Sequence, residues 1–490
     1  MSRGLGDVYK RQGLLPLAAC AQSQPVTSSA TIDALSDYIT SARDAWQVPG
    51  VAVGVVKDGE VLMSQGFGTL GLADDQPVDG ATLFAIASNT KAFTAAALAI
   101  LVDEQKLRWD DRVRDHLPYF QLYDRYVSDE MTVRDLLCHR SGLGTFSGDL
   151  LWYGTSYSPE EVIRRARHLK PVGAFRASYG YSNVMYLAAG EVVEVVSEMP
   201  WTEFVSQRFL EPLGMRRSLL SVSKLDTVDN LATPHKPRVE EVVAVPWVNW
   251  DGMAAAGGII SCTDDMTKWL QTLLNRGSSE GKTIFSPQRL EEMWTPHTPM
   301  SIQASYRREY PSTHFRAYGL GWGLRDYKGH LIVSHGGGYD GMYSRVVLVP
   351  ELQLGVVVLT NSMTSLPTAI TNRVIDQFID GEQRDWSGQM LPAFRENRQV
   401  FYDRISAQVT PLEVKTTPSK PLDAYVGSYH DVMYGEATVA LEDDQLVLRM
   451  LPFPTLVADL EHLHYDTFVL RWRQTLAWFD EGTCRFTLDD

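Results

Sequence analysis

A serine and a lysine three residues apart, Ser88 and Lys91, open an alanine-rich apolar run that extends to Leu101. Residues 91–105 contain no glycine or proline, which predicts a buried helix with both side chains at its first turn. Side chains at this spacing share one face of a helix. A serine hydroxyl is a weak nucleophile until a nearby base accepts its proton, and a lysine amine becomes such a base when burial lowers its pKa. The pair therefore predicts nucleophilic catalysis by Ser88.

The same spacing occurs twice more, at Ser221 and Lys224 and at Ser279 and Lys282. A four-residue pattern is too short to identify a nucleophile by itself. The first of these pairs lies in a polar stretch and the second in a Gly/Ser turn, so neither begins an apolar helix. Because Ser88 does, we expect it to be the reactive serine.

Tyr181 and Asn183 form a second group of candidate catalytic residues. They follow Gly180 and begin a predicted helix over 184–196. A phenol at this position can relay protons between a serine and a leaving group, and the amide can hold a lysine or a substrate carbonyl. The alternative is that these residues only cap the helix.

A third group follows the predicted strand 331–334 and consists of His335, Gly336, Gly337 and Gly338. Successive glycines let a substrate approach the backbone and leave an N–H free to bind an oxyanion. The alternative is a glycine-rich turn beside a buried histidine whose hydrogen bonds are satisfied.

Length and composition limit the classes of function. At 490 residues with 44% hydrophobic content, the chain is long enough for two globular domains. The net charge of −15 is spread along the chain and no basic block is present, so nucleic acid is not an expected partner. The four cysteines lie far apart, and neither a zinc site nor a disulfide framework is predicted. We expect no cofactor and no metal, and a small molecule or a peptide as substrate.

The N-terminal residues 1–25 look like a processing segment. Residues 13–20 are similar to the end of a secretory signal, and residues 17–20 resemble a bacterial lipobox, which predicts a periplasmic or secreted protein with a lipid anchor at Cys20. Residues 7–12 read like a translated sequencing adapter, so this region is left out of fold prediction. The alternative is an ordinary leader of a cytosolic protein.

The remaining pattern predicts an α+β fold. Strand-like segments occur near both ends of the main region, and a mainly helical insert separates them over about 106–325. We therefore expect one antiparallel sheet, built from both ends and covered by helices. The predicted strands are 51–56, 61–66, 331–334, 344–349 and 355–360.

Domain boundaries follow from the same pattern. A hydrolase-like domain is predicted over 26–384, a linker over 385–420 and a small all-β, barrel-like domain over 421–490. The chain stops just after a strand, which leads us to expect a truncated last domain.

Together, the ordered motifs Ser-x-x-Lys, Tyr-x-Asn and His-Gly-Gly resemble those of the serine β-lactamase and penicillin-binding-protein superfamily. The branch they resemble contains class C β-lactamases, D-stereospecific peptidases and β-lactamase-like esterases. The stretches 136–143, 211–215 and 256–266 are similar as well, and the resemblance covers about residues 30–380. The tail after residue 420 resembles the lipocalin-like domain that some members carry.

The resemblance implies a β-lactamase/transpeptidase-like fold and an acyl-enzyme mechanism. Ser88 would be acylated, and Lys91 and Tyr181 would share proton transfer, with either as the resting base. Asn183 would orient the substrate. The N–H groups of Ser88 and Gly338 would form the oxyanion hole.

His335 lies where many relatives have a lysine that attracts a substrate carboxylate. A histidine with an ordinary pKa of about 6.5 is mostly neutral at about pH 7.5. We therefore expect a peptidase- or esterase-like serine hydrolase that is a weak β-lactamase at most. Its activity on carboxylate-bearing substrates should rise as the pH falls toward about 6.

Two other functions fit parts of the sequence. One is a penicillin-binding or sensor protein that is acylated at Ser88 and does not turn over, because acylation and deacylation use much the same residues. The other is a metalloenzyme using His462 and His464, which lack a third ligand at suitable spacing, so packing in a strand is the better interpretation.

Overall fold

The computed structural model describes residues 29–410 and 416–487. The predicted leader, residues 1–25 with Cys20, lies outside these residues. Within the described part of the chain, no helix is both long and apolar enough to cross a membrane. The three cysteines found there, Cys138, Cys262 and Cys484, are unpaired.

The larger domain is built on one nine-stranded antiparallel sheet, with the strand order β10-β11-β12-β13-β14-β15-β1-β2-β3. Strand β1 pairs with β15, and this pairing places Val51 opposite Thr360. The prediction that both ends of this region form a single sheet is therefore confirmed. The strands are β1 (Gly50–Lys57), β2 (Glu60–Gly71), β3 (Asp74–Pro77), β10 (Thr298–Pro299), β11 (Arg316–Tyr318), β12 (Gly323–Tyr327), β13 (His330–Tyr339), β14 (Met342–Val349) and β15 (Leu354–Thr360).

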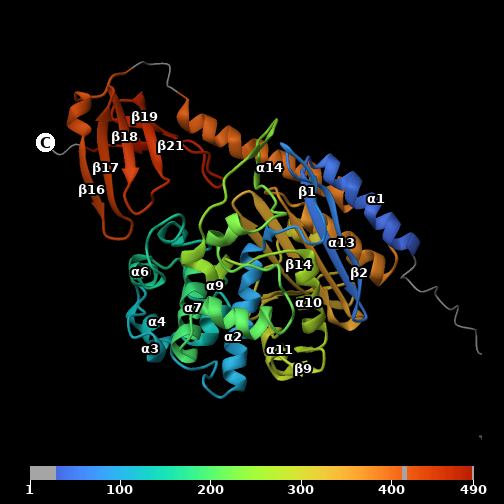
Figure 1. Cartoon of the computed structure of the whole chain (residues 1–490). Helices are drawn as coiled ribbons and strands as arrows, with labels where there is room; N and C mark the ends of the chain where they lie inside the picture. The colour runs from blue at the N-terminus through green and yellow to red at the C-terminus, as the bar shows by residue number, and fades with distance from the viewer. Residues whose placement is uncertain (1–28, 411–415, 488–490) are drawn as a thin grey trace, which may run out of the picture.

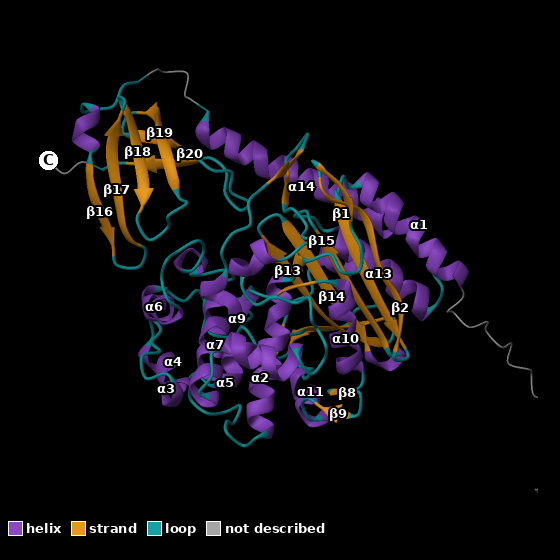
Figure 2. Cartoon of the chain, in the orientation of Figure 1, coloured by secondary structure: helices purple, strands orange, loops and turns teal. Residues whose placement is uncertain are grey.

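Helices cover both faces of this sheet (Figure 2). The N-terminal α1 and the late α13 and α14 lie on one face, and α2 and α10 lie on the other (Figure 1). The main helices are α1 (Ser29–Ala45), α2 (Thr90–Asp103), α6 (Pro159–Arg165), α7 (Asn183–Ser197), α9 (Ala254–Gly257), α10 (Thr263–Leu274), α11 (Pro287–Met293), α13 (Leu366–Ile379) and α14 (Trp386–Val409).

The central strand β1 shows why both faces need a cover. Side chains alternate between the faces of a strand. Val53 and Val55 pack in the core with α1 and α13, and Ala52 and Val56 pack in the core that includes α2 and α10. Every residue of β1 before Lys57 is buried. An apolar run of this kind is typical of a strand that is covered on both sides.

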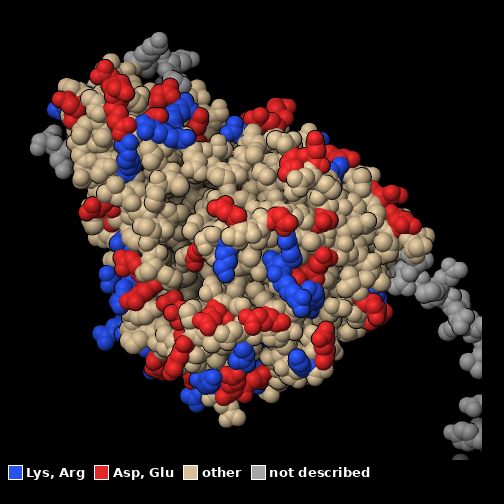
Figure 3. Space-filling view, in the orientation of Figure 1, with Lys and Arg blue, Asp and Glu red and all other residues tan. Residues whose placement is uncertain are grey.

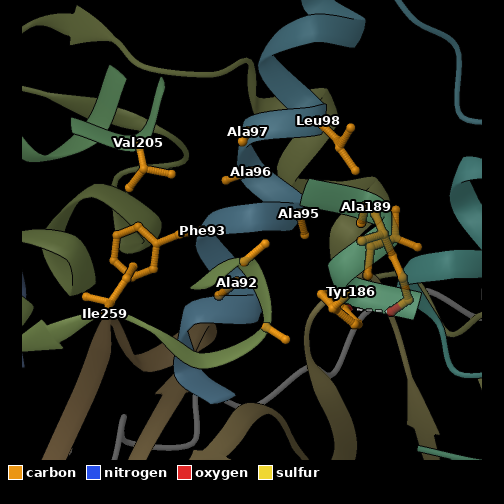
Figure 4. Packing of buried hydrophobic residues seen from close by; sticks show 14 of the residues in the cluster. Ala92, Phe93, Ala95, Ala96, Ala97, Leu98, Tyr186, Ala189, Val205 and Ile259 are labelled. Carbon is orange, nitrogen blue, oxygen red and sulfur yellow. Dashed lines mark hydrogen bonds between the residues drawn. The ribbon is translucent and has the colours of Figure 1, made fainter. Parts of the chain in front are cut away.

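Helix α2 is the most enclosed element of the larger domain. All its residues from Thr90 to Leu101 are buried. Its alanines let α7 and α9 pack closely against it, while Phe93 fills the space toward Ile259 (Figure 4). The predicted buried helix is confirmed.

The reactive-serine candidate lies just before this helix rather than in its first turn. Ser88 belongs to a 3₁₀ turn, Ala87–Asn89, which connects the short strand β4 (Phe84–Ala85) to α2. Ala87 has a φ of 47°, a left-handed conformation that is unfavourable for alanine. Such local strain occurs where the surrounding structure holds the backbone firmly, and it is common at functional sites.

The region between α2 and β11 consists mainly of helices and loops, as predicted. It also carries the small hairpin of β5 (His235–Pro237) and β6 (Val242–Ala244). The shorter helices of this region are α3 (Val113–His116), α4 (Arg125–Glu130), α5 (Val133–Leu137), α8 (Trp201–Val205) and α12 (Ala304–Glu309).

The segment 385–420, predicted to be a linker, instead contains the 24-residue helix α14 over Trp386–Val409. Trp386 is fully buried, and Met390 and Phe394 pack against the core beside α13. The later turns lie beside β21 (Gly482–Arg485) and are less buried, and Phe401 is 45% exposed. The helical period is weak in the sequence because only the first half of α14 has an apolar face to bury.

The C-terminal domain is an antiparallel sheet of six strands in sequential order, curled into a half-barrel. Its core contains Tyr425, Val439, Leu446, Leu460 and Phe468. The prediction of a small all-β, barrel-like domain is confirmed. Its strands are β16 (Gly427–Asp431), β17 (Gly435–Glu442), β18 (Gln445–Met450), β19 (Val457–His464), β20 (Thr467–Trp472) and β21 (Gly482–Arg485).

This domain contacts the helical part of the larger one beside α6 (Figure 1). The Ser156 N–H donates to the Pro452 carbonyl at 2.8 Å, and the Arg165 guanidinium donates to the Met433 carbonyl at 3.0 Å. On the face seen in Figure 3, acidic and basic side chains lie in mixed groups over both domains.

Candidate active site

Ser88 and Asn183, which come from two separate motifs, both contact Lys91. The Lys91 ammonium nitrogen lies 3.0 Å from Ser88 Oγ, 2.8 Å from Asn183 Oδ1 and 2.7 Å from the Ala256 carbonyl. Asn183 begins α7, whose packing against α2 brings it to the lysine. Ser88 is partly exposed, whereas Lys91 is fully buried. The hydroxyl is thus accessible and its neighbouring amine is not.

Burial changes the proton affinity of Lys91. Loss of solvation is the main effect and lowers the pKa of Lys91 to about 7, and the nearby Asp149 carboxylate partly opposes this shift. At pH values above about 7, the amine is mostly uncharged. In that form it can accept the proton of Ser88.

Asp149 is a site residue that sequence reasoning missed. Its carboxylate accepts hydrogen bonds from Asn183 Nδ2 at 3.0 Å and from the Trp152 indole at 3.1 Å. Burial raises the pKa of Asp149 to about 6, against the effect of these bonds and of Lys91. Asn183 therefore links the carboxylate to the lysine. No motif marks Asp149, because it lies in a short 3₁₀ helix, Asp149–Leu151, 34 residues before its partner Asn183.

Tyr181 completes the group around the serine. Its ring lies beneath the Lys91 ammonium, 4.9 Å from the ring centroid. Burial raises the pKa of Tyr181 well above 10, although a hydrogen bond with Ser88 acts in the opposite direction. The phenol is therefore neutral near pH 7.

His139 supports Tyr181 and was also missed as a site residue. The two rings are 4.2 Å apart, and His139 Nδ1 accepts the Ser182 N–H at 3.1 Å. His139 is fully buried, which holds its pKa well below 6.5. His139 lies in the stretch 136–143, whose resemblance to the family was the sequence signal that could have indicated it.

The glycine motif is part of strand β13 and does not form a turn. Gly337 pairs with Ser344 and Gly338 with Tyr343, so β14 supplies the hydrogen bonds that extend the strand to Tyr339. A Cβ at Gly337 would lie 2.1 Å from the Ile86 carbonyl. The glycine therefore allows the strand to approach the turn that carries Ser88.

His335 lies in the same strand and is neutral over a wide pH range. Its Nδ1 donates to the Gly336 carbonyl at 2.7 Å, and its Nε2 accepts from the Tyr318 hydroxyl at 2.8 Å. Burial, together with the charge of Lys91, lowers the pKa of His335 to about 3. The expectation that His335 gains charge near pH 6 is wrong, because the sequence does not reveal this degree of burial.

These groups open onto one cavity of about 900 Å³. Ser88 lies in its wall together with His335, Gly336 and Gly338, whereas Gly337 faces Ile86 and Ser344. Aromatic residues form a large part of the remaining wall, beside polar and aliphatic ones. Among the aromatic lining residues are Tyr153, Tyr179, Tyr181, Trp250, Trp478 and Phe479.

Three arginines, Arg316, Arg325 and Arg345, also line this cavity, and none forms an ion pair with another described residue. Arg345 pairs with Gly336, whereas His335 pairs with Val346. His335 also lines this cavity, and the charge of Arg345 helps to lower the pKa of His335.

The other candidate residues remain apart from this site. Ser221 bonds Asp251 at 2.6 Å, and its potential partner Lys224 is exposed. A bulge separates His462 and His464, which bond Tyr465 and Thr416 respectively. Within the described residues, a metal-like group of acids is formed by Asp376, Asp380 and Glu382, and Lys328 makes an ion pair with each of them.

The sheet, its helical cover and the serine at the start of α2 define the β-lactamase/transpeptidase fold. The chain belongs to the family described as Beta-lactamase, which matches residues 35–378. Residues 412–490 match a second family, described as a domain of unknown function (DUF3471).

Similar proteins include hydrolases. Unguisins hydrolase ungD' of Aspergillus campestris is 29% identical over 441 residues, which cover 84% of this chain and 78% of that protein. Protein flp of Staphylococcus aureus is 23% identical over 365 residues, covering 72% and 68%.

Solved structures share the fold. The octameric penicillin-binding protein homologue from Pyrococcus abyssi has a TM-score of 0.63 and 24% identity, and covers 93% of this chain and 96% of its own. A D-stereospecific amidohydrolase from Streptomyces sp. has a TM-score of 0.56 and 24% identity, covering 71% and 99%.

Proposed function

We propose that the protein is a serine hydrolase that forms an acyl-enzyme at Ser88 and cleaves amide or ester bonds. The observation that carries this proposal is the 3.0 Å distance between Ser88 Oγ and a buried amine with a pKa of about 7. A pKa near the working pH suits a general base, since the group is available unprotonated and still accepts a proton well.

In the proposed reaction, uncharged Lys91 accepts the proton of Ser88 as Oγ attacks the substrate carbonyl. The resting base is Lys91 rather than Tyr181, because the pKa of the tyrosine is raised and a neutral phenol is a poor base. The leaving group takes up a proton from Tyr181, and the Lys91 ammonium returns the serine proton to the phenol, so that both groups regain their starting states. The backbone N–H groups of Ser88 and Gly338 would stabilise the oxyanion. In deacylation, Lys91 accepts a proton from water as the water attacks the acyl carbonyl, and Ser88 Oγ takes that proton when its ester bond breaks and the product acid leaves.

The substrate class follows from the cavity. Aromatic residues form much of its wall, and His335 supplies no positive charge at neutral pH. The positive charges of the cavity come instead from Arg316, Arg325 and Arg345. We propose peptidase- or esterase-like activity on substrates without a carboxylate near His335, with weak β-lactamase activity at most. The relative named unguisins hydrolase supports a hydrolytic function.

The test uses a fluorescent fluorophosphonate probe, which labels activated serines, together with mass spectrometry of the protein mixed with small esters and amides. We expect labelling of wild type and none of Ser88→Ala. A transient acyl adduct on Ser88 with continued product release supports a hydrolase. A lasting adduct without release would instead indicate an acylated sensor, and labelling of Ser88→Ala would refute the assignment.

A further inference from the structure

The C-terminal domain contributes directly to the cavity that contains Ser88. The loop between β20 and β21, residues 473–481, is called the C-terminal arm here. It leaves the six-stranded sheet and reaches the larger domain (Figure 1). Trp478 and Phe479 of this arm line the cavity. They are more than 130 residues from the other proposed site residues in the sequence.

Trp478 lies over the glycine edge of strand β13. A Cβ at Gly338 would be 3.2 Å from the end of the Trp478 indole. The indole is nevertheless 44% exposed, which is a large fraction for a tryptophan in contact with another domain. An aromatic surface is therefore available beside the proposed oxyanion donor.

Phe479 continues this surface into the larger domain. Its ring meets Tyr153 edge to face, with centroids 5.4 Å apart. Tyr153 and Trp250 both donate to the buried Asp340 carboxylate, at 2.5 Å and 3.0 Å. These bonds fix the rings opposite the arm. The wall thus has a rigid half from the larger domain and a second half from the C-terminal domain.

A buried lysine is one of the contacts that hold the arm. The Lys236 ammonium donates to the Leu476 and Phe479 carbonyls, at 3.0 Å each, and to the Asp480 carboxylate at 2.7 Å. Lys236 is only 4% exposed. Removing one partner of such a pair leaves the other charge buried and unpaired, which is strongly unfavourable. Lys236 therefore favours the position in which Trp478 and Phe479 face the cavity.

We propose that the C-terminal arm is a specificity element that binds an apolar, preferably aromatic, group of the substrate beside the scissile bond, and that Lys236 is the positioning residue that keeps the arm in place. This inference rests on the proposed hydrolase function. Aromatic groups gain from burial and from edge-to-face contacts with such a wall. A substrate with a small acyl group would make few of these contacts.

The first experiment compares kcat/KM of the full chain on p-nitrophenyl 3-phenylpropanoate and p-nitrophenyl acetate, which differ in the acyl group and share a leaving group. For Trp478→Ala, we expect the preference for the aromatic ester to fall about tenfold or more, because hydrophobic contacts discriminate by this order. Trp478→Phe should retain part of the preference. Phe401→Ala is the control, since Phe401 is 45% exposed and lies on α14 away from the cavity.

The second experiment tests the lysine. Lys236→Met should reduce the aromatic preference in the same direction, mainly by raising KM for the aromatic ester. Lys236→Arg should restore much of it, since it keeps the charge. Lys224→Met, at an exposed lysine, should leave both esters unchanged.

Fluorophosphonate labelling of Ser88 distinguishes a failure of the specificity proposal from a failure of the proposed hydrolase function. Normal labelling with equal kcat/KM losses on both esters, or with no change in their ratio, would overturn the arm as a specificity element and leave the hydrolase assignment intact. Absence of labelling in wild type would overturn the hydrolase function and, with it, the arm's part in substrate choice.

Discussion

The two domains contribute to one cavity in different ways. The larger domain supplies a polar group in which a fully buried Lys91 makes short contacts to Ser88, Asn183 and a backbone carbonyl. The C-terminal domain supplies an arm whose Trp478 is nearly half exposed and whose Asp480 is bonded by Lys236. Bond-making chemistry requires fixed distances, whereas apolar recognition tolerates some movement.

A chain ending near Thr410 would contain every proposed catalytic residue, since none lies beyond residue 338, and should retain some chemistry on a small ester. It would lack Trp478 and Phe479, which line the cavity. Changes in the larger domain should therefore affect all substrates alike, and changes in the arm should affect their ratio.

The largest effect is expected for Ser88→Ala. Turnover of every ester and amide should fall by at least about 10⁴-fold, because no nucleophile remains. Ser221→Ala and Ser279→Ala are matched controls at the other two Ser-x-x-Lys pairs and should retain activity. Loss of activity in either control together with retention in Ser88→Ala would place the chemistry elsewhere.

Next in size is Lys91→Met, for which we expect acylation to slow by about 10²–10⁴-fold. In wild type, kcat/KM should rise as the pH increases through about 7, since Lys91 must lose its proton to act as a base. The variant should lack this acid limb, which is the fall in kcat/KM as the pH decreases below about 7. Stopped-flow acylation from pH 5 to 9 measures both effects. An unchanged limb in the variant would mean that another group is the base.

A smaller effect is expected for His335→Lys. A cation at this position should raise hydrolysis of a chromogenic cephalosporin about tenfold. One charge-assisted hydrogen bond to the carboxylate of the cephalosporin strengthens binding by about that factor. A neutral ester should not benefit. Wild type should show no gain on the cephalosporin between about pH 7.5 and 6, because the pKa of His335 is about 3. Strong cephalosporin hydrolysis by wild type would contradict this view of the substrate.

The smallest effect is expected for Asp149→Asn. The negative charge of Asp149 raises the pKa of Lys91, so its removal should move the acid limb of kcat/KM to lower pH by up to about one unit. The plateau should change little, because Asn183 still bonds Lys91. A shift to higher pH would show that Asp149 does not act through the charge of Lys91.

Much of the fold could be predicted because its signals are local. The runs 51–56, 344–349 and 355–360 are apolar and β-branched, and they lie in β1, β14 and β15. The strict absence of glycine and proline after Lys91 was sufficient to predict α2. Errors arose where a neighbouring element decides the conformation. Pairing with β14 extends β13 through three glycines, and one apolar half suffices to hold α14 as a helix.

The sequence by itself determined the family resemblance, the order of the motifs and the identity of the serine and lysine. These depend on residue types at short spacing, which no distant contact alters. Only the tertiary structure decided that Asp149 and His139 surround the lysine and tyrosine, that His335 is buried and neutral, and that Trp478 reaches Gly338. Each of these facts depends on segments far apart in the chain meeting in space, and burial and pKa arise from that packing rather than from the spacing of residues.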